Sequence, residues 1–397
     1  MEYIKGKPYF YDKNKKLKQY PYLNKDKNCD ILIIGGGING GVLNYYLSQN
    51  YDVCLVEKGR MGTCCTGCAT SLLEYQLDDF ASTLMQYMSK EDIIKCYNIG
   101  FKSFSALEKF FKENGNHCNF SLRPSLLYTN KSTDKKDILD EYNFRKENGF
   151  DCELITKKNN PFSFKIKYGI LCKNGGAELD PYLFLKQLIE NSKNQDNIFE
   201  NTEIVKIEKQ NNEFVCETKF GEKIFCKNVI CATGFNFDLS LKATSICTRF
   251  TSYSIVTNPL SEVVLKEDTL VQDNLSPYHY LRKLPDERLI YGGEDTKIKN
   301  EINFNKAIKK YEKLLKNLQK MFPKHKDKIK VDYAFCGAFG STKNNMGLIG
   351  KDENGIINFY SCGANGIINA IEGVKIVESI LKNEDNELSQ IFSVKRE

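Results

Sequence analysis

The sequence lacks tryptophan and has three histidines, His117, His279 and His325, among 397 residues. This scarcity argues against a mechanism or metal centre that needs several imidazoles. Long apolar runs are missing as well. The longest candidate, from Ile31 to Ile38, is interrupted by three glycines and is much shorter than the roughly 18 residues of a membrane span. We therefore expect no membrane span.

The start of the chain, from Lys5 to Lys18, is lysine-rich and has no apolar stretch behind it, so we expect no secretory signal. Fifteen cysteines, an odd number scattered from Cys29 to Cys362, do not form a disulfide pattern. Reduced thiols and a cytoplasmic location are the expectation. The net charge of +6 is mild and does not predict a nucleic-acid partner. The oligomeric state stays open.

Signals typical of a nucleotide-binding fold occur near residues 30, 230 and 360 and predict one domain assembled from separated pieces. Residues 1–28 are interpreted as a polar arm. Residues 29–80, 165–248 and 331–397 are assigned to a dinucleotide-binding domain, and residues 81–164 and 249–330 to a substrate domain. Amphipathic spacing predicts helices after Ser89, from Pro181 with Asp180 as N-cap, and over residues 308–322 and 367–381. Residues 130–167 are polar and loop-like.

A glycine-rich turn follows the apolar strand that ends at Ile34. Gly35, Gly37 and Gly40 fit the G-x-G-x-x-G pattern, and a helix begins within it. Such glycines allow a tight turn, close approach of a pyrophosphate and close packing of helix on strand. Glu57 ends the next strand, where a carboxylate can accept hydrogen bonds from a ribose. This βαβ unit predicts a dinucleotide, and the motif alone fits NAD or FAD.

Two further turns match a flavoprotein. Ala232-Thr233-Gly234 ends a strand, and Gly363-Ala364-Asn365-Gly366 precedes an apolar helix whose N-terminus could stabilise a reduced flavin. With the stretches 66–73, 175–181, 276–282, 292–295 and 337–350, the chain resembles the D-amino-acid oxidase-like FAD-dependent oxidoreductases. This family includes glycine oxidase, sarcosine oxidase and gamma-glutamylputrescine oxidoreductase. The resemblance implies an α/β fold: a Rossmann-like, glutathione-reductase-like FAD domain and an α+β substrate domain on an antiparallel sheet.

The resemblance also implies noncovalent FAD. Because sarcosine oxidases attach flavin to a cysteine near the position of Gly337, attachment through Cys336 remains an alternative. The expected FAD contacts are Gly35, Gly37, Ile38, Asn39, Gly40, Glu57, Lys58, Thr66, Ala69, Thr70, Ser71, Leu72, Val205, Ala232, Thr233, Gly234, Gly363, Asn365, Gly366 and Ile367.

Residues 278–282 combine two tyrosines and a histidine with one cation, Arg282. On a strand, Tyr278, Tyr280 and Arg282 share one face and His279 points away. Arg282 is the expected substrate contact, because a guanidinium matches a carboxylate. Tyr278, Tyr253 and His279 are further catalytic candidates, although His279 equally fits a hydrogen-bonded core residue.

Cys64, Cys65 and Cys68 contain a C-x-x-C spacing, which fits zinc or a redox disulfide, but zinc needs further ligands nearby. We expect no metal.

The predicted reaction oxidises the C–N bond of an amino acid or small amine by hydride transfer to flavin N5, followed by imine hydrolysis. Oxygen or an electron carrier is the expected acceptor, and relatives' oxygen-activating lysines have no clear counterpart here. A flavoprotein acting on modified tRNA and a non-catalytic redox subunit remain alternatives.

Overall fold

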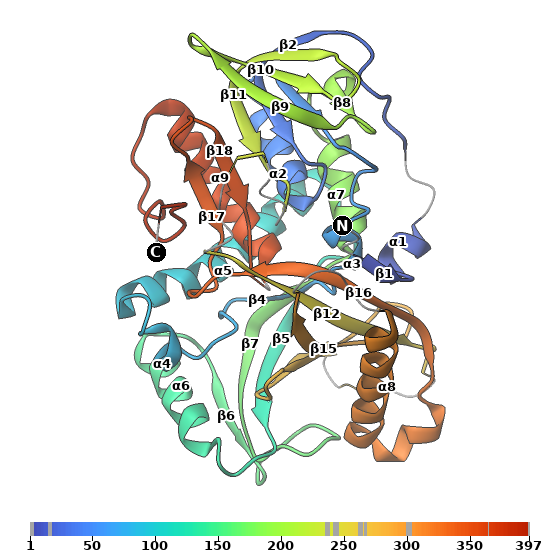
Figure 1. Cartoon of the computed structure of the whole chain (residues 1–397). Coiled ribbons are helices and arrows are strands. Elements are labelled where there is room, and N and C mark those ends of the chain that lie inside the picture. Colours follow the sequence, from blue (N-terminus) through green and yellow to red (C-terminus); the bar gives the residue numbers. More distant parts are fainter. Residues whose placement is uncertain are drawn as a thin grey trace.

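The computed structural model describes residues 4–14, 18–234, 239–240, 246–260, 265, 268–298, 304–363 and 365–395. Within these residues the strands form two sheets, one of eight strands and one of ten. The eight-stranded sheet lies at the top of Figure 1 and the ten-stranded sheet below it. None of the helices in this part of the chain is long and apolar enough to cross a membrane.

The eight-stranded sheet has a parallel centre. β2 pairs in parallel with both β11 and β3. The paired ends of these strands, residues 31–34, 229–231 and 53–56, are apolar and buried, as is typical of the centre of a parallel sheet. β9 and β10 extend β11 as an antiparallel meander. The order is β17 (Leu348–Lys351), β18 (Ile357–Tyr360), β11 (Lys223–Cys231), β2 (Lys27–Ile34), β3 (Val53–Val56) and β8 (Ile198–Phe199), with β9 (Ile204–Gln210) and β10 (Glu213–Thr218) off this path.

The ten-stranded sheet is antiparallel apart from the pair of β13 and β5. It joins segments from almost the whole chain. The order is β1 (Ile4–Gly6), β16 (Val331–Ser341), β12 (Thr248–Thr257), β15 (Leu289–Lys297), β14 (His279–Lys283), β13 (Leu270–Asp273), β5 (Ser121–Thr129), β7 (Tyr168–Glu178) and β4 (Leu72–Glu74), with β6 (Glu153–Thr156) beside β7.

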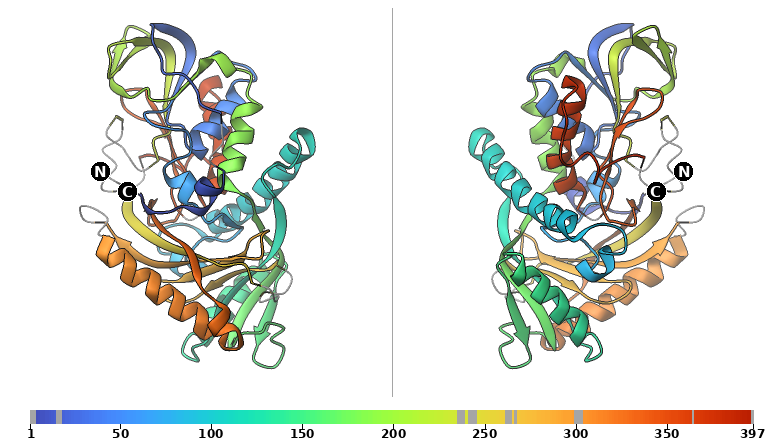
Figure 2. Two further views of the ribbon diagram at one scale, coloured as in Figure 1. Left: turned by 90° about the vertical axis from the view of Figure 1, so that its right-hand side faces the viewer. Right: turned by 90° about the vertical axis from the view of Figure 1, so that its left-hand side faces the viewer.

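The helices follow their sequence signals. α5 (Lys90–Asn114) begins after Ser89, whose side chain accepts a hydrogen bond from the Asp92 N–H, and α7 (Pro181–Glu190) begins after Asp180, which accepts two. α8 (Phe304–Met321) covers β12 and β15 on the outer face of the ten-stranded sheet (Figure 2). The loop-like interpretation of residues 130–167 is wrong, because α6 (Lys135–Glu147) and β6 form there.

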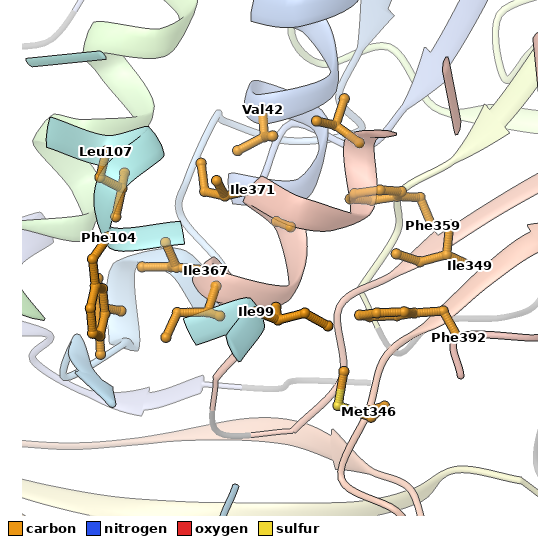
Figure 3. Close-up of a cluster of buried hydrophobic side chains, with 14 of the residues drawn as sticks. Val42, Ile99, Phe104, Leu107, Met346, Ile349, Phe359, Ile367, Ile371 and Phe392 are labelled. Atoms are coloured by element: carbon orange, nitrogen blue, oxygen red, sulfur yellow. The ribbon is translucent and has the colours of Figure 1, made fainter. Parts of the chain in front are cut away.

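The largest core packs the eight-stranded sheet against four helices, α2 (Ile38–Leu47), α5, α7 and α9 (Gly366–Lys382). α2 contacts α7 and α9, and α9 also contacts α5. Figure 3 shows this cluster between α2, α5, α9 and the C-terminal strands. It fixes the N-termini of α2 and α9 at one edge of the sheet. The side chains labelled there are Val42, Ile99, Phe104, Leu107, Met346, Ile349, Phe359, Ile367, Ile371 and Phe392.

The two sheets divide the chain differently from the proposed domain ranges. β4, β7 and β16 lie in the ten-stranded sheet, although their residues were assigned to the dinucleotide-binding pieces. The polar arm contains secondary structure as well. β1 pairs with β16, and α1 (Tyr9–Lys13) buries Tyr9 and Phe10. A strand that pairs far along the chain carries no local sign of its partner, which explains these differences.

Candidate active site

A cavity of about 560 Å³ lies between the two sheets and receives residues from both. This volume is typical of a cofactor or ligand site. One end is lined by the turns after β2, β3 and β11 of the eight-stranded sheet. The other is lined by residues of β4, β12, β14 and β15 of the ten-stranded sheet. We call these the nucleotide end and the substrate end.

The nucleotide end has the geometry that a pyrophosphate needs. α2 begins after Gly37, no side chain caps it through the N-cap residue, and its first turn has no acidic residue. A Cβ on Gly37 would come within 4 Å only of Thr66 Oγ1, at 3.3 Å, so the space above the backbone is open. A Cβ on Gly40 would lie 1.8 Å from the carbonyl oxygen of Gly35, so Gly40 permits the close contact of helix and strand.

The carboxylate of Glu57 organises the same turn. It accepts hydrogen bonds from the N–H groups of Gly36, at 2.7 Å, and Gly59, at 2.8 Å. Each carboxylate oxygen has a second lone pair for a ribose hydroxyl. Thr66 Oγ1 accepts from the Ile38 N–H at 3.0 Å, which ties the stretch before β4 to the start of α2.

All the expected FAD contacts except Gly40 line this cavity, and Gly40 lies directly beneath it as a packing residue. Gly234 is one open point of the lining: its φ is +71°, and a Cβ there would meet no described heavy atom within 4 Å. Open glycines, a helix N-terminus with no acidic residue in its first turn and a carboxylate with lone pairs for a ribose hydroxyl together fit the phosphates and ribose of a dinucleotide. Ala364, inside the second glycine motif, falls outside the described residues.

Asn365 joins α9 to the strand that crosses the cavity. Its side-chain amide donates to the carbonyl of Gln76 at 2.7 Å, and its side-chain oxygen lies 3.5 Å from the N–H of Glu74. Gly366 and Ile367 then place the N-terminus of α9 at the cavity wall. The positive end of the helix dipole therefore faces the space between the two ends.

Tyr278 and Tyr280 form the aromatic wall of the substrate end. The hydroxyl of Tyr280 is 2.9 Å from Ser252 Oγ and 3.4 Å from Ser254 Oγ. Its ring lies over Gly292, where a Cβ would come within 2.3 Å of the ring. Burial raises the pKa of Tyr280 to about 12 and that of Tyr278 well above its usual value. Both phenols are therefore neutral hydrogen-bonding groups at neutral pH.

Three carboxyl side chains, of Glu74, Asp78 and Asp295, line the same end. Burial raises the pKa of Glu74 to about 7, against the opposing effects of Gln76 and Arg145. It likewise raises the pKa of Asp295 to about 6. Within the described structure, the buried oxygens Glu74 Oε1 and Asp295 Oδ1 have no hydrogen-bond partner, and neither has Gln76 Oε1. Because buried acceptors are normally hydrogen-bonded, we expect a bound molecule to donate to these oxygens.

The site residues expected from the sequence did not include Glu74, Gln76, Asp78, Tyr280 or Asp295. One signal was present for Glu74, because it directly follows the stretch expected to cross the flavin. Another was present for Asp295, which ends the 292–295 motif.

Arg282 does not line the cavity. Its guanidinium, 2% exposed, pairs with Glu178 at 3.1 Å and donates to the carbonyls of Thr70, at 2.8 Å, and Leu179, at 2.9 Å. It also lies over the ring of Phe10. Its donors are thus directed at the backbone of the Thr70 stretch rather than at the cavity.

His279 lies on the opposite face of β14, as strand alternation predicts. Its ring nitrogens contact Asp273 at 2.9 Å and Glu294 at 3.1 Å, beneath α8. Burial lowers the pKa of His279, but the two carboxylates outweigh this effect and the pKa is raised. Tyr253 faces the same side, where its hydroxyl contacts Thr296 at 3.0 Å. Neither residue lines the cavity.

Cys64, Cys65, Cys68 and Cys362 line the cavity. Cys336 is buried on β16, in the cluster under α8. None of these cysteines forms a disulfide. Among the described residues, no group of three or more His, Cys, Asp or Glu side chains is placed to hold a metal ion.

The comparisons with known proteins agree with this architecture. The model of the family described as "DAO: FAD dependent oxidoreductase" matches residues 30–377. The chain therefore belongs to this family of FAD-dependent oxidoreductases, and the predicted fold class and the FAD cofactor are confirmed.

Among solved structures, glycine oxidase from Geobacillus kaustophilus aligns with a TM-score of 0.77 at 16% identity, covering 94% of this chain and 99% of that one. L-proline dehydrogenase from P. horikoshii gives a TM-score of 0.73 at 18% identity, covering 94% and 97%. Identities this low show the fold alone.

A curated relative is 26% identical over 223 residues, which is 56% of this chain and 43% of the relative. It is the Bacillus subtilis (strain 168) protein named "Putative Rieske 2Fe-2S iron-sulfur protein YhfW". The match therefore spans less than half the length of that curated relative.

Proposed function

We propose that the chain oxidises the C–N bond of a small amine or amino acid. The observation that carries this proposal is the single cavity that joins a dinucleotide-type turn to a buried polar chamber. FAD bound there would supply the hydride acceptor for oxidation of the carbon that bears the nitrogen, and water would hydrolyse the imine product. The names of the structural neighbours, an oxidase and a dehydrogenase of amino acids, support this reaction class.

The protein's own contribution is orientation and charge. Tyr278 and Tyr280 shape the substrate end, and buried side chains exclude water from it. The N-terminus of α9 stabilises negative charge beside Gly366 and Ile367. Residues 35–40 and Glu57 hold the nucleotide half of the cofactor. No histidine is required.

For Arg282 we propose a positioning role in place of the predicted substrate contact. Its hydrogen bond to the Thr70 carbonyl fixes the stretch that lines the cavity. We also propose that FAD is held noncovalently, since Cys336 is buried within the sheet and away from the lining.

We propose an electron carrier, rather than oxygen, as acceptor. Lys58 is the only basic side chain among the described lining residues, and it follows Glu57 at the nucleotide end. A cation beside the reacting ring, which would stabilise superoxide, is therefore missing from the described substrate end. The iron–sulfur name of the curated relative supports the same acceptor class. The cysteines, which form no disulfide in the described structure, support a reducing, cytoplasmic location.

The test is the visible spectrum of the purified protein, followed anaerobically as amino acids, N-methyl amino acids and amines are added. We expect flavin bands that one substrate class bleaches. Absence of flavin after incubation with FAD contradicts the cofactor site. Flavin that no amine bleaches contradicts amine oxidation and favours the tRNA or redox-partner alternatives. Slow reoxidation by air and fast reoxidation by a one-electron acceptor would support the proposed acceptor.

A further inference from the structure

The charged side chains that line the substrate end are all acidic. Glu74, Asp78 and Asp295 line it, and the described residues supply no basic side chain there. Arg282, the expected partner of a substrate carboxylate, already pairs with Glu178 and two backbone carbonyls. A carboxylate entering this chamber would lose its hydration and meet like charges without a cationic partner.

The same chamber contains hydrogen-bond acceptors without donors. The side chains of Glu74 and Gln76 are 7% and 4% exposed, and each has one buried oxygen without a partner among the described residues. Asp295 Oδ1 is a third. An ammonium group supplies three N–H donors and a compensating positive charge, which is what these acceptors lack.

The charges of Asp78, Asp295 and Glu74 each raise the pKa of Tyr278, after its burial. A cation bound beside one of these carboxyls would offset the cost of burying it.

Hydride transfer needs the lone pair of the reacting nitrogen, so that nitrogen cannot be the cation that stays paired with the carboxyls. The paired group must be a second nitrogen of the substrate. We propose, building on the amine oxidation above, that the substrate is an alkyl diamine without a carboxylate. The unpaired carboxyl oxygen of Glu74 or of Asp295 accepts a hydrogen bond from its non-reacting ammonium group.

The experiment compares ligands that differ by one group, using the flavin-loaded protein. Putrescine, ornithine and n-butylamine share a four-carbon chain. Putrescine carries two amines, ornithine carries two amines and a carboxylate, and n-butylamine carries one amine. The concentration dependence of anaerobic flavin reduction gives the affinity of each. We expect putrescine to bind at least about tenfold more tightly than the other two, the size of one hydrogen bond to a charged group. Equal or tighter binding of ornithine or n-butylamine overturns the proposal.

Variants assign the selectivity to residues. Glu74→Gln and Asp295→Asn keep size and remove charge, so the variant at the residue that pairs with the ammonium should weaken putrescine binding about ten- to hundredfold, and n-butylamine binding by less. Glu208→Gln, on the exposed face of β9, is the matched control and should alter neither ligand. Flavin content and melting temperature show whether each variant folds. Equal loss for both ligands overturns the assignment. If ornithine bleaches the flavin and putrescine does not, this inference fails while amine oxidation stands; if nothing bleaches it, both fail.

Discussion

The two ends of the cavity are built on different principles. The nucleotide end consists mainly of backbone and glycine from one βαβ unit, residues 31–57, and it recognises its ligand by close approach. The substrate end consists of side chains from β4, β12, β14 and β15, which are far apart in the sequence. Changes at the first end should therefore affect folding and cofactor content, and changes at the second should affect selectivity.

Two glycines three positions apart give the largest expected effect. Gly40→Val places side-chain atoms against the Gly35 carbonyl, where even a Cβ would be 1.8 Å away, and should cost more than about 3 kcal/mol of unfolding free energy. Gly37→Val should fold and lose FAD, because its side chain enters the open pyrophosphate space. Thermal unfolding and flavin absorbance per protein measure the two effects. Gly59→Ala is the control, because its Cβ would lie 3.7 Å from the nearest atom, an ordinary van der Waals distance.

Copurification of Gly37→Val with a full complement of flavin would contradict the assigned nucleotide end. Normal folding of Gly40→Val would contradict the close contact of α2 and β2.

A second comparison separates a buried ion pair from a surface one on the same carboxylate. Arg282 and Arg123 both pair with Glu178, but their side chains are 2% and 26% exposed. Arg282→Met should cost about 3 kcal/mol, because buried acceptors, the Thr70 and Leu179 carbonyls and part of the Glu178 charge, lose their partner. Arg123→Met should cost less than about 1 kcal/mol. Urea unfolding measures both, and equal costs would mean that burial does not separate the two pairs.

The smallest expected effect is a pH dependence of the unfolding free energy that arises from His279, on the outer face of the ten-stranded sheet. The pKa of His279 is raised in the folded protein, so its contribution to stability is complete below about 6.5 and is lost as pH rises through the folded pKa. His279→Gln should remove this loss between about pH 6 and 9. The groups facing the ring are Asp273, Glu294, Asn317 and Tyr291.

Melting temperatures across that range test the pH slope, and flavin reduction by substrate should be unaffected, since His279 does not line the cavity. An unchanged pH slope in the variant would assign the titration to another group.

Sequence patterns predicted the parts of the molecule whose signals are local. The βαβ unit, α5 and α7 carry their strand, cap and turn residues within a few positions of one another. α6 was missed because two of the residues it buries are charged. Glu141 and Arg145 pair at 2.8 Å inside the core, so the helix looks polar in sequence.

The substrate end was harder to predict for a different reason. Asp295 enters the chamber through the pairing of β15 with β12 and β14, and Glu74 enters it through β4 and β7. Pairings between distant strands leave no periodic pattern at either residue. Arg282 shows the converse: its residue type suggested a ligand contact, and only the tertiary structure revealed that Glu178 and two carbonyls use its donors.

The pairing of β1 with β16 also bears on how the chain matures during synthesis. Ile4 pairs with Gly337, and the cavity wall includes residues 337–340 of β16 together with Gly366 and Ile367 at the start of α9. A ribosome makes β1 long before its partner strand emerges. The nascent chain therefore carries unpaired strand edges, exposed to aggregation, until β16 has been translated. Because the cavity wall is incomplete until then, cofactor capture is a late event in the biogenesis of this protein.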